Sequence, residues 1–174
     1  MYHNIKFKEA VKNIESKNDI KIVEGIKLLR ESGKPEAVEL ITNLLRNEIS
    51  EEVKKECTKF LNDIKDQFAS KYIVEEINKN TDKELLGILV SCAWQNNLDF
   101  SEYMETFARI VLQEEYLIAF EAFTVIENNI DRLPADKANH IEDIISKGLK
   151  SVNKEKQLMI KELIEVIKDV KKTK

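Results

Sequence analysis

The sequence predicts an all-α protein built from stacked pairs of helices, and three observations support this. Apolar residues recur at positions i, i+3, i+4 and i+7 along almost the whole chain, and no stretch alternates with the period of two typical of a half-buried strand. Only four Gly and two Pro occur in 174 residues, which is too little turn-forming sequence for a sheet protein of this size. The apolar pattern also repeats at a nearly constant interval along the chain.

The apolar periodicity divides the chain into about ten helices joined by short loops. Because the loops are short, consecutive helices are expected to pack as antiparallel neighbours. The expected helices cover residues 4–16, 18–32, 35–48, 51–66, 69–79, 82–97, 100–113, 115–130, 135–150 and 154–172.

Several helix boundaries have a local cause in the sequence. Gly33 can close the second helix in the left-handed conformation that glycine tolerates. Ser50 and Asn153 can cap the fourth and tenth helices with a side-chain oxygen. Thr81 stands three residues before Glu84, which is the spacing of a capping box, so we expect the sixth helix to start there.

An apolar stripe of four positions recurs in the second helix of each pair. Consecutive sets lie 33, 32 and 41 residues apart. Thirty-one residues before the first set, Ile22, Ile26 and Leu29 fit the pattern, and Arg30 breaks its last position. Trp94, the only Trp, falls in a packing position, and we expect it to be mostly buried. The sets are Val53, Cys57, Phe60 and Leu61; Leu86, Val90, Ala93 and Trp94; Ile118, Ala122, Val125 and Ile126; and Met159, Leu163, Val166 and Ile167.

The helix pairs, short loops and repeat interval resemble the HEAT and armadillo-like class of helical repeats over nearly the whole chain. The interval is shorter than the roughly 40 residues usual for HEAT repeats. TPR-like pairing fits the interval better, but the small-residue signature of TPR repeats is missing. The HEAT-like resemblance implies a right-handed α-α superhelix of about five stacked antiparallel helix pairs, with residues 1–174 as a single domain. It also implies protein binding more often than catalysis.

The charge distribution indicates the class of partner. The net charge of −4 argues against a general nucleic-acid binder. From Glu84 to Asp136 the chain has ten acidic residues, two Arg and no Lys, so this window carries −8 and the rest of the chain +4. We expect the acidic middle to favour another protein that presents a basic surface or a basic peptide.

Sequence motifs for catalysis or cofactor binding are missing. There is no GxSxG, no Gly-rich phosphate loop and no HExxH. Cys57 and Cys92 form no CxxC pair, and we expect both to be buried, inert thiols. His140 shares a helix face with Asp136 and Asp143, but with no second His or Cys nearby we expect a solvated polar face there. The sequence therefore predicts no enzymatic activity, no cofactor and no metal site.

The sequence also predicts a cellular compartment. No apolar signal region is visible, and the longest apolar run, LLGILVSCAW, is about half the length that a membrane-spanning helix requires. A reduced cytoplasmic protein without a membrane partner is therefore expected. The abundance of Lys, Ile and Asn suggests an AT-rich, bacterial genome. The sequence does not predict the oligomeric state.

The helix expected at residues 115–130 carries a second apolar stripe, almost opposite the repeat stripe. It consists of Tyr116, Phe120 and Phe123, with Glu127 on the same arc. These aromatic rings either pack on a neighbouring helix, as such stripes usually do, or form an exposed patch in acidic surroundings. Because an unpaired buried carboxylate is costly, we expect the stripe to be partly exposed near Glu127.

The leading hypothesis is a non-enzymatic protein–protein interaction module, such as a scaffold, an adaptor or an inhibitor. We expect the aromatic stripe to lie on a groove that also carries Glu84 or Gln95 from the sixth helix. The alternative is a nucleic-acid-binding or DNA-repair protein like the HEAT-like DNA glycosylases, which would need a basic groove. The predicted partner-binding residues are Tyr116, Phe120, Phe123, Glu127, Glu84 and Gln95.

Overall fold

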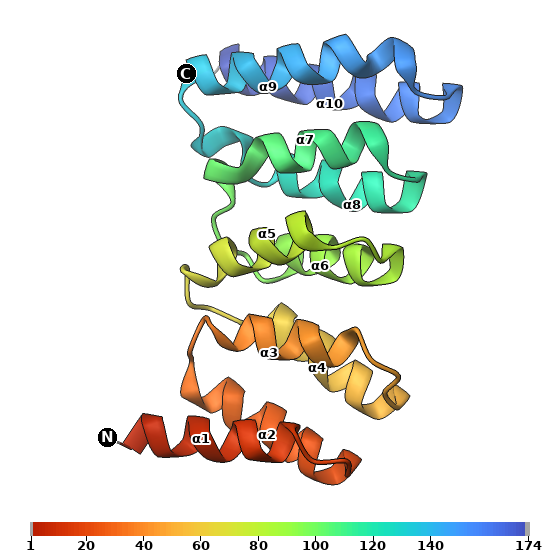
Figure 1. Ribbon diagram of the computed structural model, residues 1–174. Coiled ribbons are helices and arrows are strands. Elements are labelled where there is room, and N and C mark those ends of the chain that lie inside the picture. The colour runs from red at the N-terminus through yellow and green to blue at the C-terminus, as the bar shows by residue number, and fades with distance from the viewer. Residues whose placement is uncertain (1, 173–174) are drawn as a thin grey trace. The chain divides into compact units, whose positions relative to one another are not determined.

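The computed structural model describes residues 2–172, and its regular structure is entirely helical (Figure 1). This confirms the predicted all-α class. Over the described residues there is no strand, and three short 3₁₀ turns accompany the α-helices: Ser101–Tyr103, Ile130–Arg132 and Leu149–Ser151. The α-helices are α1 (Tyr2–Ile14), α2 (Asp19–Ser32), α3 (Ala37–Leu45), α4 (Glu51–Asp63), α5 (Ala69–Lys79), α6 (Lys83–Gln95), α7 (Met104–Gln113), α8 (Tyr116–Glu127), α9 (Ala135–Gly148) and α10 (Lys154–Lys172).

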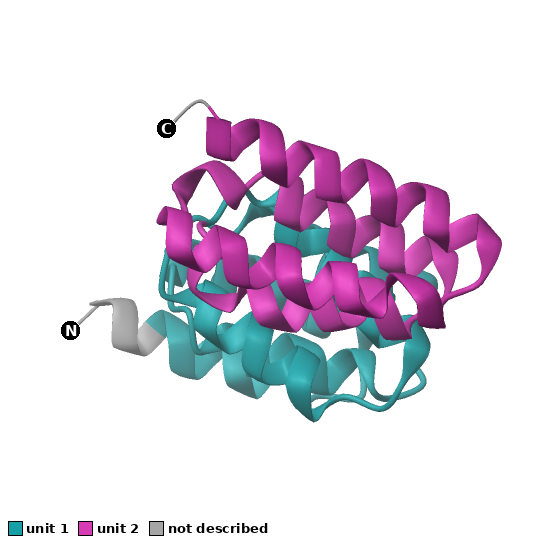
Figure 2. Ribbon diagram, turned by 90° about the horizontal axis from the view of Figure 1, so that it is seen from above, with its two compact units in different colours: residues 1–98 teal, residues 99–174 magenta. Residues whose placement is uncertain are grey.

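The chain forms two compact units, unit 1 (Met1–Leu98) and unit 2 (Asp99–Lys174) (Figure 2). In unit 1, α1 packs on α2, α3 on α4 and α5 on α6, and these pairs meet through α2–α4, α4–α6 and α3–α5 contacts. In unit 2, α7 packs on α8 and α9 on α10, with α7–α9 and α8–α10 contacts between the pairs. Within each unit, second helices therefore lie beside second helices. A single domain over residues 1–174 stays a prediction.

The helix ends follow local capping chemistry. Gly33 closes α2 with a φ of 63°, and its N–H donates to the carbonyl of Leu29. The Ser50 side chain accepts the N–H of Val53 at the start of α4. These caps confirm the predictions for Gly33 and Ser50.

The predicted start of the sixth helix is wrong by one residue. Asp82, and not Thr81, caps α6, because its carboxylate accepts the N–H of Leu85 at 2.9 Å. Both residue types are good caps, and the side chain that reaches the third N–H of the helix decides the boundary.

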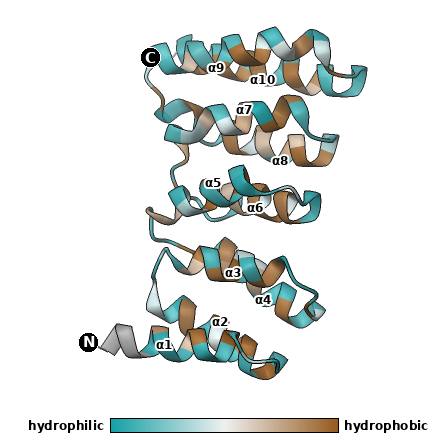
Figure 3. Cartoon of the chain, in the orientation of Figure 1, coloured by the Kyte–Doolittle hydropathy of each residue, from teal (hydrophilic) through white to brown (hydrophobic). Residues whose placement is uncertain are grey.

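The repeated stripe forms the buried side of the second helices. Hydrophobic and hydrophilic segments alternate along the helices (Figure 3), as expected for helices covered on one side. Trp94 is only half-buried, whereas Leu61, Ile126 and Ile167, at the same register, are fully buried. All other stripe residues from Val53 to Ile167 are buried, except for the half-buried Ile118 and Val166.

Arg30, which interrupts the stripe in α2, forms ion pairs with α4. Its guanidinium lies 3.6 Å from the carboxylate of Glu56 and 3.7 Å from that of Asp63. The aliphatic part of an arginine can still pack against apolar neighbours while its charged end reaches polar groups. The break in the apolar pattern is thus a site of electrostatic contact between α2 and α4.

A buried carboxylate links α3 to α5 in unit 1. Glu76 on α5 is 4% exposed and accepts hydrogen bonds from Arg46 at 2.5 Å and from Thr42 at 3.0 Å. Lys79 adds a charge 3.6 Å away. Burial opposes ionisation of Glu76, but the hydrogen bonds from Arg46 and Thr42 and the two positive charges outweigh it, so the pKa of Glu76 is lowered.

Glu76→Gln is expected to destabilise the protein by about 1–3 kcal/mol, because it removes charge-assisted hydrogen bonds from a buried site. The folded pKa lies below the unfolded value of about 4.3, so the charge stabilises the protein fully above that pH and less as the pH falls through the folded pKa. Urea denaturation of both proteins between neutral pH and pH 3 should therefore show a difference that shrinks in acid.

Glu75→Gln is the matched control for Glu76→Gln. Glu75 precedes Glu76 on α5 and pairs with Lys71 across 3.9 Å, with both side chains largely in solvent. Its loss should cost less than about 1 kcal/mol. Equal effects of the two substitutions, or a difference that stays constant with pH, would contradict the role given to Glu76.

Candidate protein-interaction surface

Helix α8 in unit 2 is held in place at both ends by buried polar side chains. Lys156 on α10 is 5% exposed, and its ammonium group donates to the carbonyls of Leu112 at 2.9 Å and Glu114 at 2.7 Å, just before α8 begins. Burial lowers the pKa of Lys156, although the charge of Glu114 opposes this. The lysine therefore fixes the turn between α7 and α8 against the start of α10.

The C-terminal end of α8 is fixed by Asn129, which is 2% exposed. Its side-chain oxygen accepts the backbone N–H of Phe100 at 3.0 Å, and its amide group donates to the carbonyl of Val125 at 2.8 Å. This asparagine connects the end of α8 to the segment that leads into α7. With both ends fixed, α8 presents a defined outer face.

Three aromatic rings form a row along α8. The ring centroids of Tyr116 and Phe120 are 6.4 Å apart, and those of Phe120 and Phe123 are 5.9 Å apart, with 10° between the ring planes in each pair. Tyr116 is 36% exposed, Phe120 is 48% exposed and Phe123 is 6% exposed. The row therefore passes from the surface at its N-terminal end into the core at its C-terminal end.

The direction of this gradient corrects a prediction. We expected the exposed part to lie near Glu127, but Phe123, the aromatic residue closest to it in sequence, is buried. Glu127 itself is exposed, so its carboxylate does not require an open space around the neighbouring ring. A helix face can be covered by its neighbours at one end and open at the other, and the periodicity of the sequence does not distinguish the two ends.

Two exposed leucines on α8 and on its neighbour α10 were missed by the sequence reasoning. Leu117 on α8 is 78% exposed, and Leu158 on α10 is 73% exposed. They stand one residue before the stripe residues Ile118 and Met159, so they have the same register in their helices. A leucine at this position, outside the stripe, in both helices could have been noticed in the sequence. We name Tyr116, Leu117, Phe120 and Leu158 the apolar patch.

Carboxylates accompany the apolar patch on α8. From Glu114 to Asp131 the sequence has five acidic residues and no Lys or Arg. On α8 itself, Glu121 lies about 40° beyond Leu117 around the helix, and Glu127 lies on the arc of the aromatic row, about one turn after Phe123. On α8 the apolar side chains therefore have carboxylates beside them, whereas on α10 the exposed residues one turn from Leu158 have both signs: Lys154, Glu155, Lys161 and Glu162.

The structure places Glu84 and Gln95 in unit 1, whereas the aromatic row belongs to unit 2. A groove that carries both the aromatic row and Glu84 or Gln95 stays a prediction. The Gln95 side chain accepts a hydrogen bond from Asn62 at 2.8 Å and donates one to Ser91 at 2.8 Å. These bonds within unit 1 occupy the amide group of Gln95.

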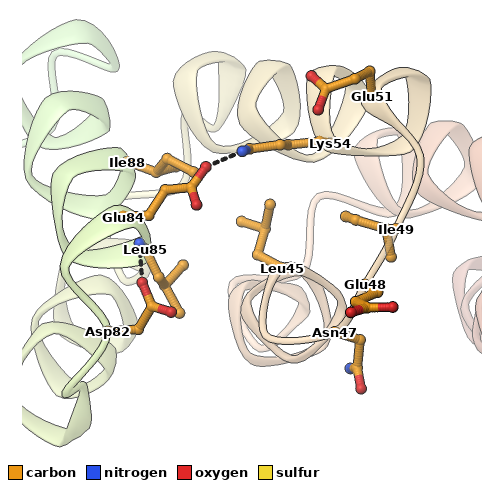
Figure 4. A pocket seen from close by; sticks show the side chains of 10 residues that line it. All are labelled: Leu45, Asn47, Glu48, Ile49, Glu51, Lys54, Asp82, Glu84, Leu85 and Ile88. Atoms are coloured by element: carbon orange, nitrogen blue, oxygen red, sulfur yellow. Dashed lines mark hydrogen bonds and ion pairs between the residues drawn. The ribbon is translucent and has the colours of Figure 1, made fainter.

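Glu84 lies in an acidic pocket of about 210 Å³ within unit 1. Figure 4 shows its carboxylate turned toward the ammonium group of Lys54 on α4, with which it forms an ion pair. The hydrogen bond to Glu84 raises the pKa of Lys54. The pocket is lined by Leu45, Asn47, Glu48, Ile49, Glu51, Lys54, Asp82, Glu84, Leu85 and Ile88.

Among the described residues, the two thiols are buried and His140 faces one carboxylate. Cys57 and Cys92 are buried, as predicted, and burial raises the pKa of both thiols, that of Cys57 to about 12. His140 lies 3.1 Å from the carboxylate of Glu105, and both side chains are exposed. In the described part of the chain, no three His, Cys, Asp or Glu side chains gather closely enough to hold a metal ion. None of the described helices combines the length and apolar character that a membrane span requires.

No protein-family model matches the chain, and no curated protein sequence matches it. An engineered protein with a known crystal structure is similar at 20% sequence identity and a TM-score of 0.50, over 92% of this chain and 78% of that one. This likeness concerns the fold alone. A de novo designed 16-helix transmembrane nanopore solved by cryo-EM matches at 14% identity over 98% of this chain and 56% of that one, with a TM-score of 0.20.

The gradient along the aromatic row predicts different costs for neighbouring substitutions. Phe123→Ala should lower the free energy of unfolding by about 3 kcal/mol or more, as deletion of a core ring does. Phe120→Ala should cost about 1 kcal/mol, because half of this ring is in solvent and the substitution leaves no closed cavity. Urea denaturation followed by circular dichroism measures both values. A larger loss for Phe120→Ala than for Phe123→Ala would contradict the gradient.

Proposed function

We propose that the protein is a non-enzymatic protein–protein interaction module, and that the apolar patch and its surrounding carboxylates contact the partner. The observation that carries this proposal is the exposure of Tyr116, Leu117 and Phe120 side by side on one fixed helix. Exposed apolar side chains that gather on one face mark interaction sites more often than scattered ones do. Tyr and Phe are also enriched at the centres of protein interfaces.

The proposal includes the architecture that would display the patch. The repeat interval of 31 to 33 residues, with one longer step, and the contacts between second helices within each unit support a HEAT-like, right-handed superhelix of about five stacked antiparallel helix pairs. Such repeat proteins use extended surfaces to bind other proteins. The acidic window from Glu84 to Asp136 supports a partner with a basic surface or a basic peptide.

A peptide-display selection against the folded protein tests the proposed function without assuming the chemistry of the partner. Peptides enriched on the native chain should lose at least about tenfold in affinity for the variant Leu117→Ser/Phe120→Ser, because central apolar contacts carry most of the binding energy. Affinity is measured by fluorescence anisotropy, and circular dichroism confirms that the variant is folded.

The matched control for that selection is Ile20→Ser/Phe68→Ser. Ile20 is 71% exposed and Phe68 is 76% exposed, and both belong to unit 1. This variant also removes two exposed apolar side chains, but it leaves the apolar patch intact. Binding that is lost equally in both variants, or a selection that yields no peptide dependent on Leu117 and Phe120, would refute the proposed function.

Duplex DNA should not bind at about physiological salt, because the acidic window repels phosphates and no counterions are released on contact. Fluorescence anisotropy of a labelled duplex, titrated with protein at low and at physiological salt, measures this directly. Tight binding that weakens steeply with salt would instead favour the nucleic-acid-binding alternative.

A further inference from the structure

The apolar patch combines side chains from two helices, and one buried side chain links the beginnings of these helices. We infer that Lys156 is the positioning residue of the patch: it sets the spacing between Leu117 on α8 and Leu158 on α10, so that one partner can contact both. The part of this inference that concerns a partner rests on the proposed function. The argument uses residues of unit 2 only.

The two halves of the patch lie at neighbouring helix ends. Helices α8 and α10 are in contact, and both begin at the same end of unit 2 (Figure 1). Leu117 is the second residue of α8, and Leu158 is the fifth residue of α10. The spacing between these two side chains therefore depends on how the first turns of the two helices are held.

Apolar packing holds these first turns only weakly. Tyr116 and Leu117 are exposed, and Ile118 is half-buried. Within residues 154–158 of α10, Lys156 is the only buried residue. Burial of apolar surface is also non-directional, so it does not by itself fix the position of one helix end against another. The link between the two turns has to come from a directional contact.

Lys156 supplies that contact. Its ammonium group donates to the carbonyls of Leu112 at 2.9 Å and of Glu114 at 2.7 Å, just before α8 begins. Its own backbone N–H donates to the side-chain oxygen of Asn153 at 2.9 Å, which fixes the residue at the start of α10. Lys156 stands two residues before Leu158, so the same residue is tied to both halves of the patch.

The consequence for binding follows from this geometry. Hydrogen bonds tolerate only a narrow range of distance and angle, so the two short bonds of Lys156 leave little freedom for the turn before α8. A partner that covers both leucines then meets a surface that is already ordered. Without the bonds, part of the binding energy would be spent on ordering the two turns.

The first test measures the spacing in the protein alone. Leu117→Cys and Leu158→Cys place two nitroxide labels at exposed positions, whereas the buried thiols of Cys57 and Cys92 are protected from labelling in the folded chain. Electron paramagnetic resonance gives the distribution of distances between the labels. Lys156→Met keeps an unbranched apolar side chain but removes the N–H donors, and it should broaden the distribution.

Glu76→Gln is the matched control for Lys156→Met. It also removes charge-assisted hydrogen bonds from a buried site, but in unit 1, so it should leave the distribution unchanged. Circular dichroism verifies that each variant is folded. If Lys156→Met does not fold, Lys156→Arg decides, because the larger planar guanidinium reaches the same carbonyls only when the turn moves, which should shift the mean distance.

Two results of this measurement would overturn the inference. One is a native distribution that the substitution of Lys156 leaves unchanged. The other is a change of equal size in Glu76→Gln, which would show a general effect of lost stability.

The second test measures binding by peptides from the display selection that require both Leu117 and Leu158. Lys156→Met, or Lys156→Arg in its place, should weaken them about fivefold or more without contacting them, and Glu76→Gln should not. Unchanged affinity, or a selection in which peptides require Leu117 and Phe120 but never Leu158, overturns the role of Lys156 in partner binding and leaves the proposed function standing. A selection that yields no such peptide refutes the proposed function, and the distance measurement still decides whether Lys156 sets the spacing.

Discussion

The structure depends on burial of one repeated apolar stripe in the second helix of each pair. A single helix pair cannot cover this stripe from all sides, so each second helix is packed against its own first helix and against a neighbouring second helix. The size of the side chains varies along the stripe. The third and fourth positions are Phe60 and Leu61 in α4, whereas α6 has the small Ala93 followed by the large Trp94. Part of the Trp94 ring reaches solvent.

Buried polar side chains add specificity to this apolar core. Glu76 connects α3 to α5, Lys156 connects α10 to the turn before α8, and Asn129 connects the end of α8 to the segment before α7. Each of them makes several hydrogen bonds, which compensates for the loss of water. Because these bonds form in only one relative position of the elements, they fix the register of helices that apolar contacts alone would hold less strictly.

Helix α8 has apolar residues on two sides. Ala122, Val125 and Ile126 are fully buried on one side. The rings of Tyr116 and Phe120 are exposed on the other side. Core packing and an exposed aromatic surface thus lie on two sides of one helix.

The sequence by itself determined the all-α class, the helices with their ends to within about four residues, the caps at Gly33 and Ser50, and the burial of most of the stripe. All of these follow from local chemistry or from a period of 3.6 residues, which assigns a side chain to one face of its own helix. The tertiary structure alone decided that Phe120 is exposed and Phe123 is buried, and how far Leu117 projects into solvent. These exposures depend on where the neighbouring helices end. The periodicity of one helix does not show how far a neighbouring helix extends along it. The bonds of Glu76 and Lys156 were equally invisible, because their partners are 30 or more residues away in the sequence.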